Sequence, residues 1–252
     1  MEMPNLPVEQ TQISRRLFFL LPLLPLLRRK RRVAIAGIRF RILRHGRSLR
    51  RYLHIHGDEK TARQVLIDHM KWARGIAYLI ESEQRNVSIL DGKIDPNRMF
   101  STEGASRSLA TLNPNWPPAK IAAALRLLDR DRPNFIRSIK PPQGGLLLCL
   151  HNNSPEYSVA DEISVSDLAS IANPDHPREF MLATDPRDFA ILRRSAFNVV
   201  LQHSKPADDD GSLSRLSARI GFRYLNIESP HGAAAAQISM LSWAEDHLPA
   251  RY

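Results

Sequence analysis

Cysteine and long hydrophobic runs are scarce in this sequence. Cys149 is the only cysteine among 252 residues, which excludes an intrachain disulfide and a metal cluster built from cysteines. It lies within an apolar run, so we interpret it as a packed thiol. The apolar stretch at 17–27 would rise about 17 Å as a helix, whereas the hydrocarbon of a bilayer is about 30 Å thick. We therefore do not expect this stretch to span a membrane.

Acidic residues are absent between Ser14 and Arg51, a segment that holds 13 Lys or Arg. From Tyr52 to Tyr252 the remaining 23 Lys and Arg face 24 Asp and Glu. The formal net charge of +10 therefore comes from the N-terminal part, and the rest is close to neutral. A basic face for phosphates is not indicated, and we expect no nucleic-acid partner.

Residues 1–37 are predicted to be a leader, followed by one domain at 38–252. The leader joins Ser-Arg-Arg-Leu-Phe at 14–18 to an apolar stretch, an arrangement similar to a twin-arginine export signal. Pro22 and Pro25 interrupt that stretch, and five basic residues at 28–32 stand where a cleavage site is expected. We expect an exported or periplasmic, or a membrane-associated, protein that contacts a membrane or the export machinery through residues 14–32. A cytoplasmic protein, with a leader that results from a misplaced start, is the alternative.

Apolar content of 43% with 25% charged residues is typical of a globular protein, and the length suffices for one sizeable core. Segments with strand character alternate with segments whose apolar residues recur at helical spacing, which predicts an α/β sheet with helices on both faces. No internal repeat is visible. The expected strands are 39–43, 49–55, 76–80, 87–90, 146–150, 180–183, 199–202 and 222–227, and the expected helices are 59–73, 117–128, 186–195 and 212–220.

The motif His56-Gly57-Asp58-Glu59 lies at a predicted strand-to-helix junction. Gly57 can make a tight turn without a Cβ clash, so the imidazole and the Glu59 carboxylate can point at one spot. Both groups are zinc ligands, and a catalytic zinc needs three protein ligands and one open position. The same four residues also fit an ordinary solvated turn. His54 shares a face with His56 and is a candidate to support the ligands.

His151 directly follows the apolar run at 146–150. The carboxyl ends of strands form the ligand-binding crevice of open α/β sheets, so His151 and His56 are expected at the same edge. With Glu59 they make a His, Glu, His set, although a histidine at such a position is also a common structural residue. Glu228 ends the strand predicted at 222–227, and a carboxylate there can take a proton from a metal-activated water.

The segment Asp95-Pro96-Asn97-Arg98 lies between these motifs. An Arg fork beside an Asn amide suits a substrate carboxylate. Asp95 can accept the free N–H of a metal-bound imidazole and thereby fix its tautomer. The alternative is a simple loop turn, which these residue types also favour.

Taken in order, the four blocks resemble the signature of the zinc carboxypeptidase superfamily, closest to its succinylglutamate desuccinylase/aspartoacylase branch. The blocks are His56-Gly57-Asp58-Glu59, Asp95 to Phe100, His151-Asn152-Asn153 and Ile227-Glu228, and the match runs from about residue 50 to 232. The resemblance implies one zinc ion on His56, Glu59 and His151, a substrate carboxylate on Asn97 and Arg98, and Glu228 as general base and acid. It also implies a single mixed, mostly parallel sheet flanked by helices, as in zinc carboxypeptidase-like (phosphorylase/hydrolase-like) folds.

The sequence departs from that branch in several places. Pro96 stands where Leu is usual. The arginine that steadies the oxyanion has no diagnostic spacing here, and Arg85 is the candidate, with Lys93 as the alternative. Tyr157 is the candidate for a tyrosine that closes over the substrate. The branch carries an additional β-domain beyond the point where this sequence ends, so we expect no gating by such a domain.

These motifs predict a zinc hydrolase that cleaves an amide bond next to a free carboxylate, in a peptide, a cell-wall peptide or an N-acyl amino acid. The alternative from another class is a non-catalytic protein that binds carboxylates or peptides on a hydrolase scaffold. A third possibility gives the basic leader the main role, as a tether to anionic lipid or nucleic acid.

Overall fold

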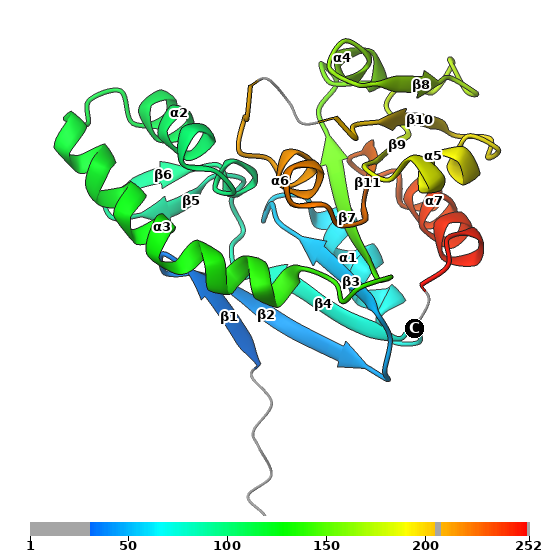
Figure 1. The fold of residues 1–252 in the computed structure, drawn as a ribbon, viewed down its shortest axis with the longest axis horizontal. Coiled ribbons are helices and arrows are strands. Elements are labelled where there is room, and N and C mark those ends of the chain that lie inside the picture. The colour runs from blue at the N-terminus through cyan, green and yellow to red at the C-terminus, as the bar shows by residue number, and fades with distance from the viewer. Residues whose placement is uncertain (1–30, 205–207, 251–252) are drawn as a thin grey trace, which may run out of the picture.

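A computed structural model describes residues 31–204 and 208–250 (Figure 1). Its main feature is a nine-stranded sheet with the strand order β1-β2-β4-β3-β7-β11-β9-β10-β8. A separate small sheet pairs β5 with β6. The strands are β1 (Arg32–Ile35), β2 (Ile38–His45), β3 (Arg50–His54), β4 (Gly75–Ile80), β5 (Val87–Ile89), β6 (Gly92–Ile94), β7 (Leu146–Asn153), β8 (Leu168–Ser170), β9 (Phe180–Ala183), β10 (Asn198–Leu201) and β11 (Tyr224–Pro230).

The sheet is mixed, as predicted. Strands β4, β3, β7 and β11 run parallel in its centre, and β9 and β10 form a further parallel pair. The pairs β1–β2, β2–β4, β11–β9 and β10–β8 are antiparallel. The carboxyl ends of β3, β7 and β11 therefore lie at one edge, where a ligand site is expected.

Helices cover both faces of the sheet (Figure 1). One apolar cluster joins the sheet to α2 (Thr102–Leu112), α3 (Pro118–Ile139) and α6 (Leu213–Ile220), and a second joins the other face to α1 (Lys60–His69), α5 (Pro186–Leu192) and α7 (Ala234–His247). The short helix α4 (Val159–Ile163) follows β7. Strand β7 contributes Leu147 and Cys149 to the first cluster and Leu146, Leu148 and Leu150 to the second. Burial on both faces explains its continuous apolar run.

Several elements differ from the sequence-based expectation. The helix predicted at 117–128 continues to Ile139, with Pro133 inside it. The strand predicted at 146–150 continues to Asn153, so His151 lies within β7 and not after it. Helix α7 was not predicted, because its alanines and small residues give little contrast between a buried and an exposed face.

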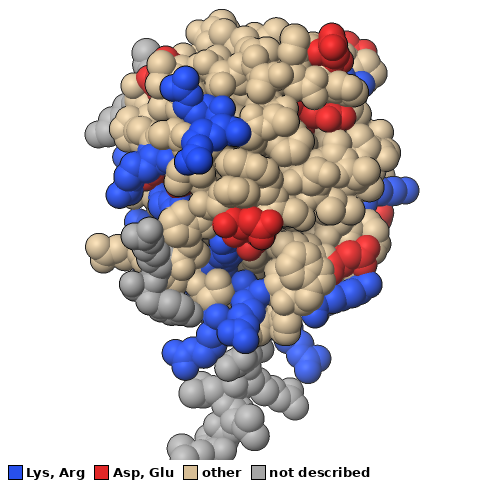
Figure 2. Space-filling view, turned by 90° about the vertical axis from the view of Figure 1, so that its right-hand side faces the viewer, with Lys and Arg blue, Asp and Glu red and all other residues tan. Residues whose placement is uncertain are grey.

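The sheet begins before the domain boundary predicted at residue 38, because β1 pairs with β2 from Arg32 onward. Of the leader predicted at 1–37, which includes the export-signal segment at 14–32, residues 1–30 lie outside the described residues. Within the described ranges no helix is both long and apolar enough to cross a membrane. Figure 2 shows Lys and Arg side chains along the left and lower parts of the face in view, with others at its right edge. On β2, Arg39, Arg41 and Arg44 are exposed.

Candidate active site

His56 lies in the turn that connects β3 to α1. Gly57 is required there by a close approach, because a Cβ on it would lie 2.3 Å from the carbonyl oxygen of Ser82. Its N–H donates to the carbonyl oxygen of Gln84 over 3.1 Å, and its backbone is not left-handed. The loop after β4 thus holds the turn that carries His56.

Glu59 occupies the N-cap position of α1, but its side chain does not cap the helix. The N–H of Ala62 donates instead to Oδ1 of Asn152 on β7, over 2.8 Å. This side chain supplies the hydrogen bond that a capping residue usually makes. The carboxylate of Glu59 is therefore left to point toward the site. The Nε2 of His54 bonds to the carbonyl oxygen of Glu59 over 3.0 Å, so His54 supports the backbone of this residue.

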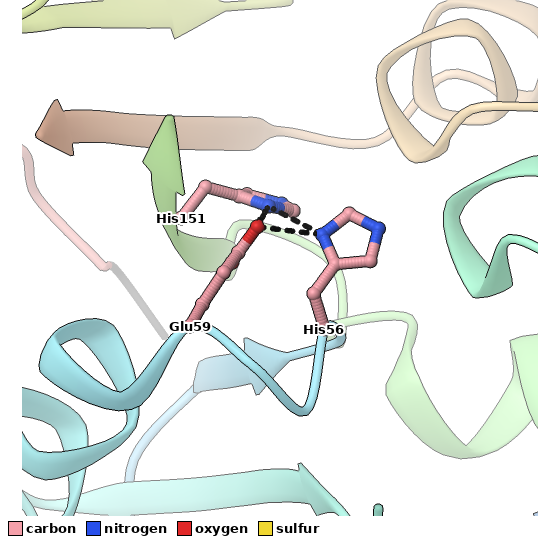
Figure 3. Close-up of side chains that lie close together, drawn as sticks. All are labelled: His56, Glu59 and His151. Atoms are coloured by element: carbon pink, nitrogen blue, oxygen red, sulfur yellow. Dashed lines mark hydrogen bonds and ion pairs between the residues drawn. The ribbon is translucent and has the colours of Figure 1, made fainter. Parts of the chain in front are cut away.

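The side chains of His56, Glu59 and His151 converge on one point (Figure 3). The two Nδ1 atoms of the histidines are 3.3 Å apart. Oε1 of Glu59 is 2.8 Å from Nδ1 of His56, and its Oε2 is 3.2 Å from Nδ1 of His151. All three residues are at most 3% exposed. Three segments distant in sequence thus place two imidazoles and one carboxylate within reach of a single ion.

Opposite charges shift the pKa of each of these three side chains in the direction of its ionised form. Burial favours the neutral form of Glu59, but the imidazoles of His151 and His56 outweigh it and hold the pKa of Glu59 well below its ordinary value. Burial also lowers the pKa of both histidines. The carboxylates of Glu59 and Asp95 nevertheless raise the pKa of His56, and Cys149 and Glu59 raise the pKa of His151 well above its ordinary value.

Without a metal ion, the side chains of His56, Glu59 and His151 cannot satisfy one another's polar atoms fully. Oε2 of Glu59 is buried and, although it lies 3.2 Å from Nδ1 of His151, makes no hydrogen bond among the described residues, an arrangement that usually costs stability. Two nitrogens 3.3 Å apart can share at most one proton. Two imidazole nitrogens and one carboxylate oxygen are the donor types that zinc takes in catalytic sites, where one position stays open.

Each histidine has a partner on its other ring nitrogen. Nε2 of His56 bonds to Oδ1 of Asp95 over 2.9 Å. Asp95 also accepts from the N–H of Asn97 over 2.8 Å and caps the 3-10 turn Pro96–Arg98. Pro96 is well tolerated at this first position because its missing N–H would have no partner there. Asp95 thus contacts the ring nitrogen of His56 that the sequence motif assigned to it.

The partner of His151 is unexpected. Its Nε2 lies 3.1 Å from Sγ of Cys149, which is two residues earlier on the same face of β7 and fully buried. The sequence had suggested only a packed thiol. The alternation of side chains along a strand brings residues i and i+2 to one face, and this spacing was the available signal.

Glu228 lies beside His151, because the parallel pairing of β11 with β7 sets these two residues opposite each other. Its Oε1 accepts from Asn226 over 3.0 Å and its Oε2 accepts from Asn153 over 3.3 Å. Burial raises the pKa of Glu228, and so does Glu59, while His151 and Asn226 lower it; the net direction is upward. A carboxylate with a raised pKa is a better proton acceptor. The two asparagines were not predicted, although Asn226 is conspicuous as a polar residue in the apolar strand before Glu228.

The predicted substrate-binding residues reach the same cavity, of about 780 Å³. Oδ1 of Asn97 accepts from the N–H of Leu213, which leaves the NH₂ of that amide available as a donor. Arg98 also lines the cavity, where its Nη1 lies 3.4 Å from Oδ2 of Asp210. Asp210 was not predicted, and its carboxylate pairs with the guanidinium that the sequence motif assigns to a substrate carboxylate.

Of the remaining candidates, Arg85 and Tyr157 line the cavity and Lys93 does not. Nη1 of Arg85 contacts Oε1 of Glu59 over 3.1 Å, so this arginine reaches the ligand set and lines the cavity. Lys93, the alternative, is exposed on β6 and is not among the residues that line the cavity. Tyr157 lines it too, but its hydroxyl donates to Glu162 and not toward the metal ligands.

Solved structures similar to this one include a succinylglutamate desuccinylase/aspartoacylase from Rhodobacter sphaeroides (TM-score 0.41, 13% identity, 84% of this chain and 59% of that chain). Another is a provisionally assigned metallopeptidase from Shewanella denitrificans (TM-score 0.45, 14% identity, 86% of this chain and 84% of that chain). A third is a product-bound ectoine utilization protein from Ruegeria pomeroyi (TM-score 0.45, 13% identity, 84% of this chain and 60% of that chain). This chain thus spans about three fifths of the first and third proteins. No family model matches the chain, and no curated protein matches it.

Proposed function

We propose that this protein is a zinc-dependent hydrolase that cleaves an amide bond next to a free carboxylate. The observation that supports this most is the convergence of His56, Glu59 and His151, with Glu228 opposite His151 on the neighbouring strand. These three side chains offer two imidazole nitrogens and one carboxylate oxygen, which are donor types of catalytic zinc sites. A zinc ion held there supplies Lewis acidity and lowers the pKa of a coordinated water toward about 7.

The side chains of this chain would then have separate tasks. Glu228 accepts a proton from the attacking water, whose oxygen bonds to the amide carbonyl carbon. It returns a proton to the departing amine nitrogen when the carbon–nitrogen bond breaks. Each oxygen of Glu228 receives one amide N–H and keeps lone-pair capacity for this exchange. Asparagine donors thus orient the base without blocking it.

Asn97 and Arg98 would bind the substrate carboxylate, the former through its free NH₂ and the latter through its guanidinium. Because both belong to the turn that Asp95 caps, the substrate anchor and the His56 ring are set by one short segment. Holding the scissile bond at a fixed place relative to the base provides much of the acceleration in such reactions. Arg85, beside Glu59, is the candidate to stabilise negative charge on the carbonyl oxygen.

The alternative, a non-catalytic protein that binds carboxylates or peptides, retains the same anchor but needs no base. The presence of Glu228 with a raised pKa favours the hydrolase. The substrate is proposed to be a small peptide or an N-acyl amino acid.

The test begins with the metal content of the purified protein beside that of His151→Ala, with His176→Ala as a control in which an exposed histidine is removed. We expect about one zinc per chain in the wild type and the control, and little in His151→Ala. Hydrolysis of a panel of N-acyl amino acids and peptides then follows. Equal, sub-stoichiometric zinc in all three proteins would contradict the proposal.

A further inference from the structure

We propose that the part of the cavity beyond Glu228 is a specificity pocket for a positively charged side chain, such as that of lysine, ornithine or arginine. The inference rests on the proposed function, because it names the side chain next to the bond that is cleaved. It is carried by two acceptors among the residues that line the cavity, Oδ1 of Asn226 and the carboxylate of Glu162, neither of which has a task in the proposed reaction.

The pocket follows the sheet away from the metal ligands. Tyr224, Asn226 and Glu228 alternate along β11 and so project from one face of the sheet. Leu182 of β9 pairs with Asn226, and all four residues line the cavity. Two residues of a strand span about 7 Å between their Cα atoms, and the Asn226 amide leans toward Glu228, with its Nδ2 3.0 Å from Oε1 of Glu228. A substrate with its amide at Glu228 can therefore place its side chain over Asn226.

Asn226 presents an unused acceptor to this pocket. Its Nδ2 donates to Oε1 of Glu228 over 3.0 Å, and because a carboxylate only accepts, this contact fixes which end of the amide is oxygen. Oδ1 is buried and has no hydrogen-bond partner among the described residues. The residue is 8% exposed. A buried acceptor without a donor is unfavourable, so a donor on a bound side chain would satisfy it.

Glu162 lines the same cavity and adds a negative charge to it. It accepts from the hydroxyl of Tyr157 and from Nε2 of the buried Gln202. Both donors are neutral, and no Lys or Arg within the described ranges makes an ion pair with Glu162. Burial, with the carboxylates of Glu228 and Glu162, raises the pKa of Tyr157, so Tyr157 stays a donor. The Glu162 carboxylate is thus held in place while its charge is not balanced.

The arginines of the cavity do not supply that balance. Arg98 pairs with Asp210 and Arg85 pairs with Glu59, whereas Arg215 donates to the carbonyl oxygen of Val165 and makes no ion pair with Glu162 among the described residues. A cationic side chain would meet Oδ1 of Asn226 and the Glu162 carboxylate, whereas an acidic side chain would meet a like charge. The pocket therefore favours an ammonium or guanidinium group over a carboxylate or an alkyl chain of equal length.

The test compares substrates that differ only at this side chain. The zinc-loaded full chain is given N-acetyl-lysine, N-acetyl-norleucine and N-acetyl-glutamate, and the matching dipeptides with C-terminal lysine, norleucine or glutamate. Norleucine has the four side-chain carbons of lysine and lacks its ammonium group. We expect kcat/KM for lysine to exceed that for norleucine by at least about tenfold, as a charged hydrogen bond would provide, and glutamate to be poorest.

Two variants connect this ratio to the wall. Glu162→Gln removes the charge and keeps hydrogen-bonding capacity, and Asn226→Leu removes the acceptor. Both variants should bring the ratio of kcat/KM for lysine to kcat/KM for norleucine close to one. Asn226→Leu also removes the contact of Asn226 with Glu228, so the comparison uses this ratio and not the absolute rates. Asp175→Asn, which neutralises an exposed acid outside the cavity, should leave the ratio unchanged. Circular dichroism checks that each variant is folded.

The outcomes separate the two proposals. Hydrolysis with equal rates for lysine and norleucine, or with a preference for glutamate, overturns the pocket and leaves the hydrolase standing. If no substrate of the panel is cleaved, the hydrolase fails, and calorimetry with free lysine and norleucine decides the pocket. Lysine binding no tighter than norleucine, or undiminished in Glu162→Gln, would then overturn it.

Discussion

Glu228 on β11 and His151 on β7 are directly opposite each other in a parallel strand pair. Neighbouring strands are about 4.8 Å apart, so the candidate base and one candidate metal ligand are separated by a fixed backbone distance without any intervening loop. Rigid elements position such groups more accurately than loops do. This relationship suggests how zinc binding and proton transfer can be tested separately.

Replacing Glu228 with glutamine should remove the proton acceptor and keep the shape of the side chain. We expect kcat to fall by about 10²–10⁴ while zinc content stays at the wild-type level. In the wild type, activity should decrease as the pH is lowered, because only the ionised form of Glu228 accepts a proton. The midpoint of this decrease should lie above 4.5, the ordinary pKa of Glu, because burial raises the pKa of Glu228. Full activity of Glu228→Gln would show that another group is the base.

Asp95→Asn should weaken zinc binding, because Asp95 fixes the ring of His56 through Nε2. Loss of such a support commonly reduces metal affinity by about 10- to 100-fold. Competition with a chelator measures the affinity directly, independently of turnover. Asp175→Asn is the matched control, and an unchanged affinity in Asp95→Asn would show that the turn does not position His56.

Cys149 offers a similar test for His151. Cys149→Ser keeps a polar atom near Nε2, whereas Cys149→Val fills the space with methyl groups and leaves that nitrogen without a partner. We expect zinc affinity to be close to wild type in the serine variant and clearly lower in the valine variant. If both variants bind zinc equally well, the 3.1 Å contact is only a packing contact.

Asp210→Asn should make the substrate anchor more accessible. The Asp210 carboxylate lies 3.4 Å from the Arg98 guanidinium, and a substrate carboxylate must compete with it. Removing this charge should lower KM by severalfold with little change in kcat, and Arg98→Lys should raise KM because the planar fork is lost. A higher KM in Asp210→Asn would indicate that Asp210 holds Arg98 in its binding position.

Removal of residues 1–30 should leave zinc content and hydrolysis unchanged, because β1 begins at Arg32. Removal of residues 1–37 also deletes β1, which pairs along its whole length with β2, and should lower the free energy of unfolding. Chemical denaturation of both truncated proteins measures the difference. Loss of activity in the shorter truncation would give the leader a direct part in function.

The sequence alone determined the alternation of strands and helices and the order of the four motifs. The apolar run of β7 could be identified because a strand buried on both faces needs apolar residues at every position. Local signals also gave the end of α6, where Gly221 adopts the left-handed conformation of a C-cap. His56 and Glu59 could be paired because a turn and the start of a helix keep them within a few residues.

Only the tertiary structure decided which further side chains complete the site. Cys149 faces His151, Asn226 and Asn153 hold Glu228, and Asp210 meets Arg98. The contacts of Asn153 with Glu228 and of Asp210 with Arg98 join residues far apart in the chain. They depend on strand order and register, which local patterns do not encode. The sequence specified the chemical groups through local periodicity, whereas the packing of distant strands fixed which of these groups share a site.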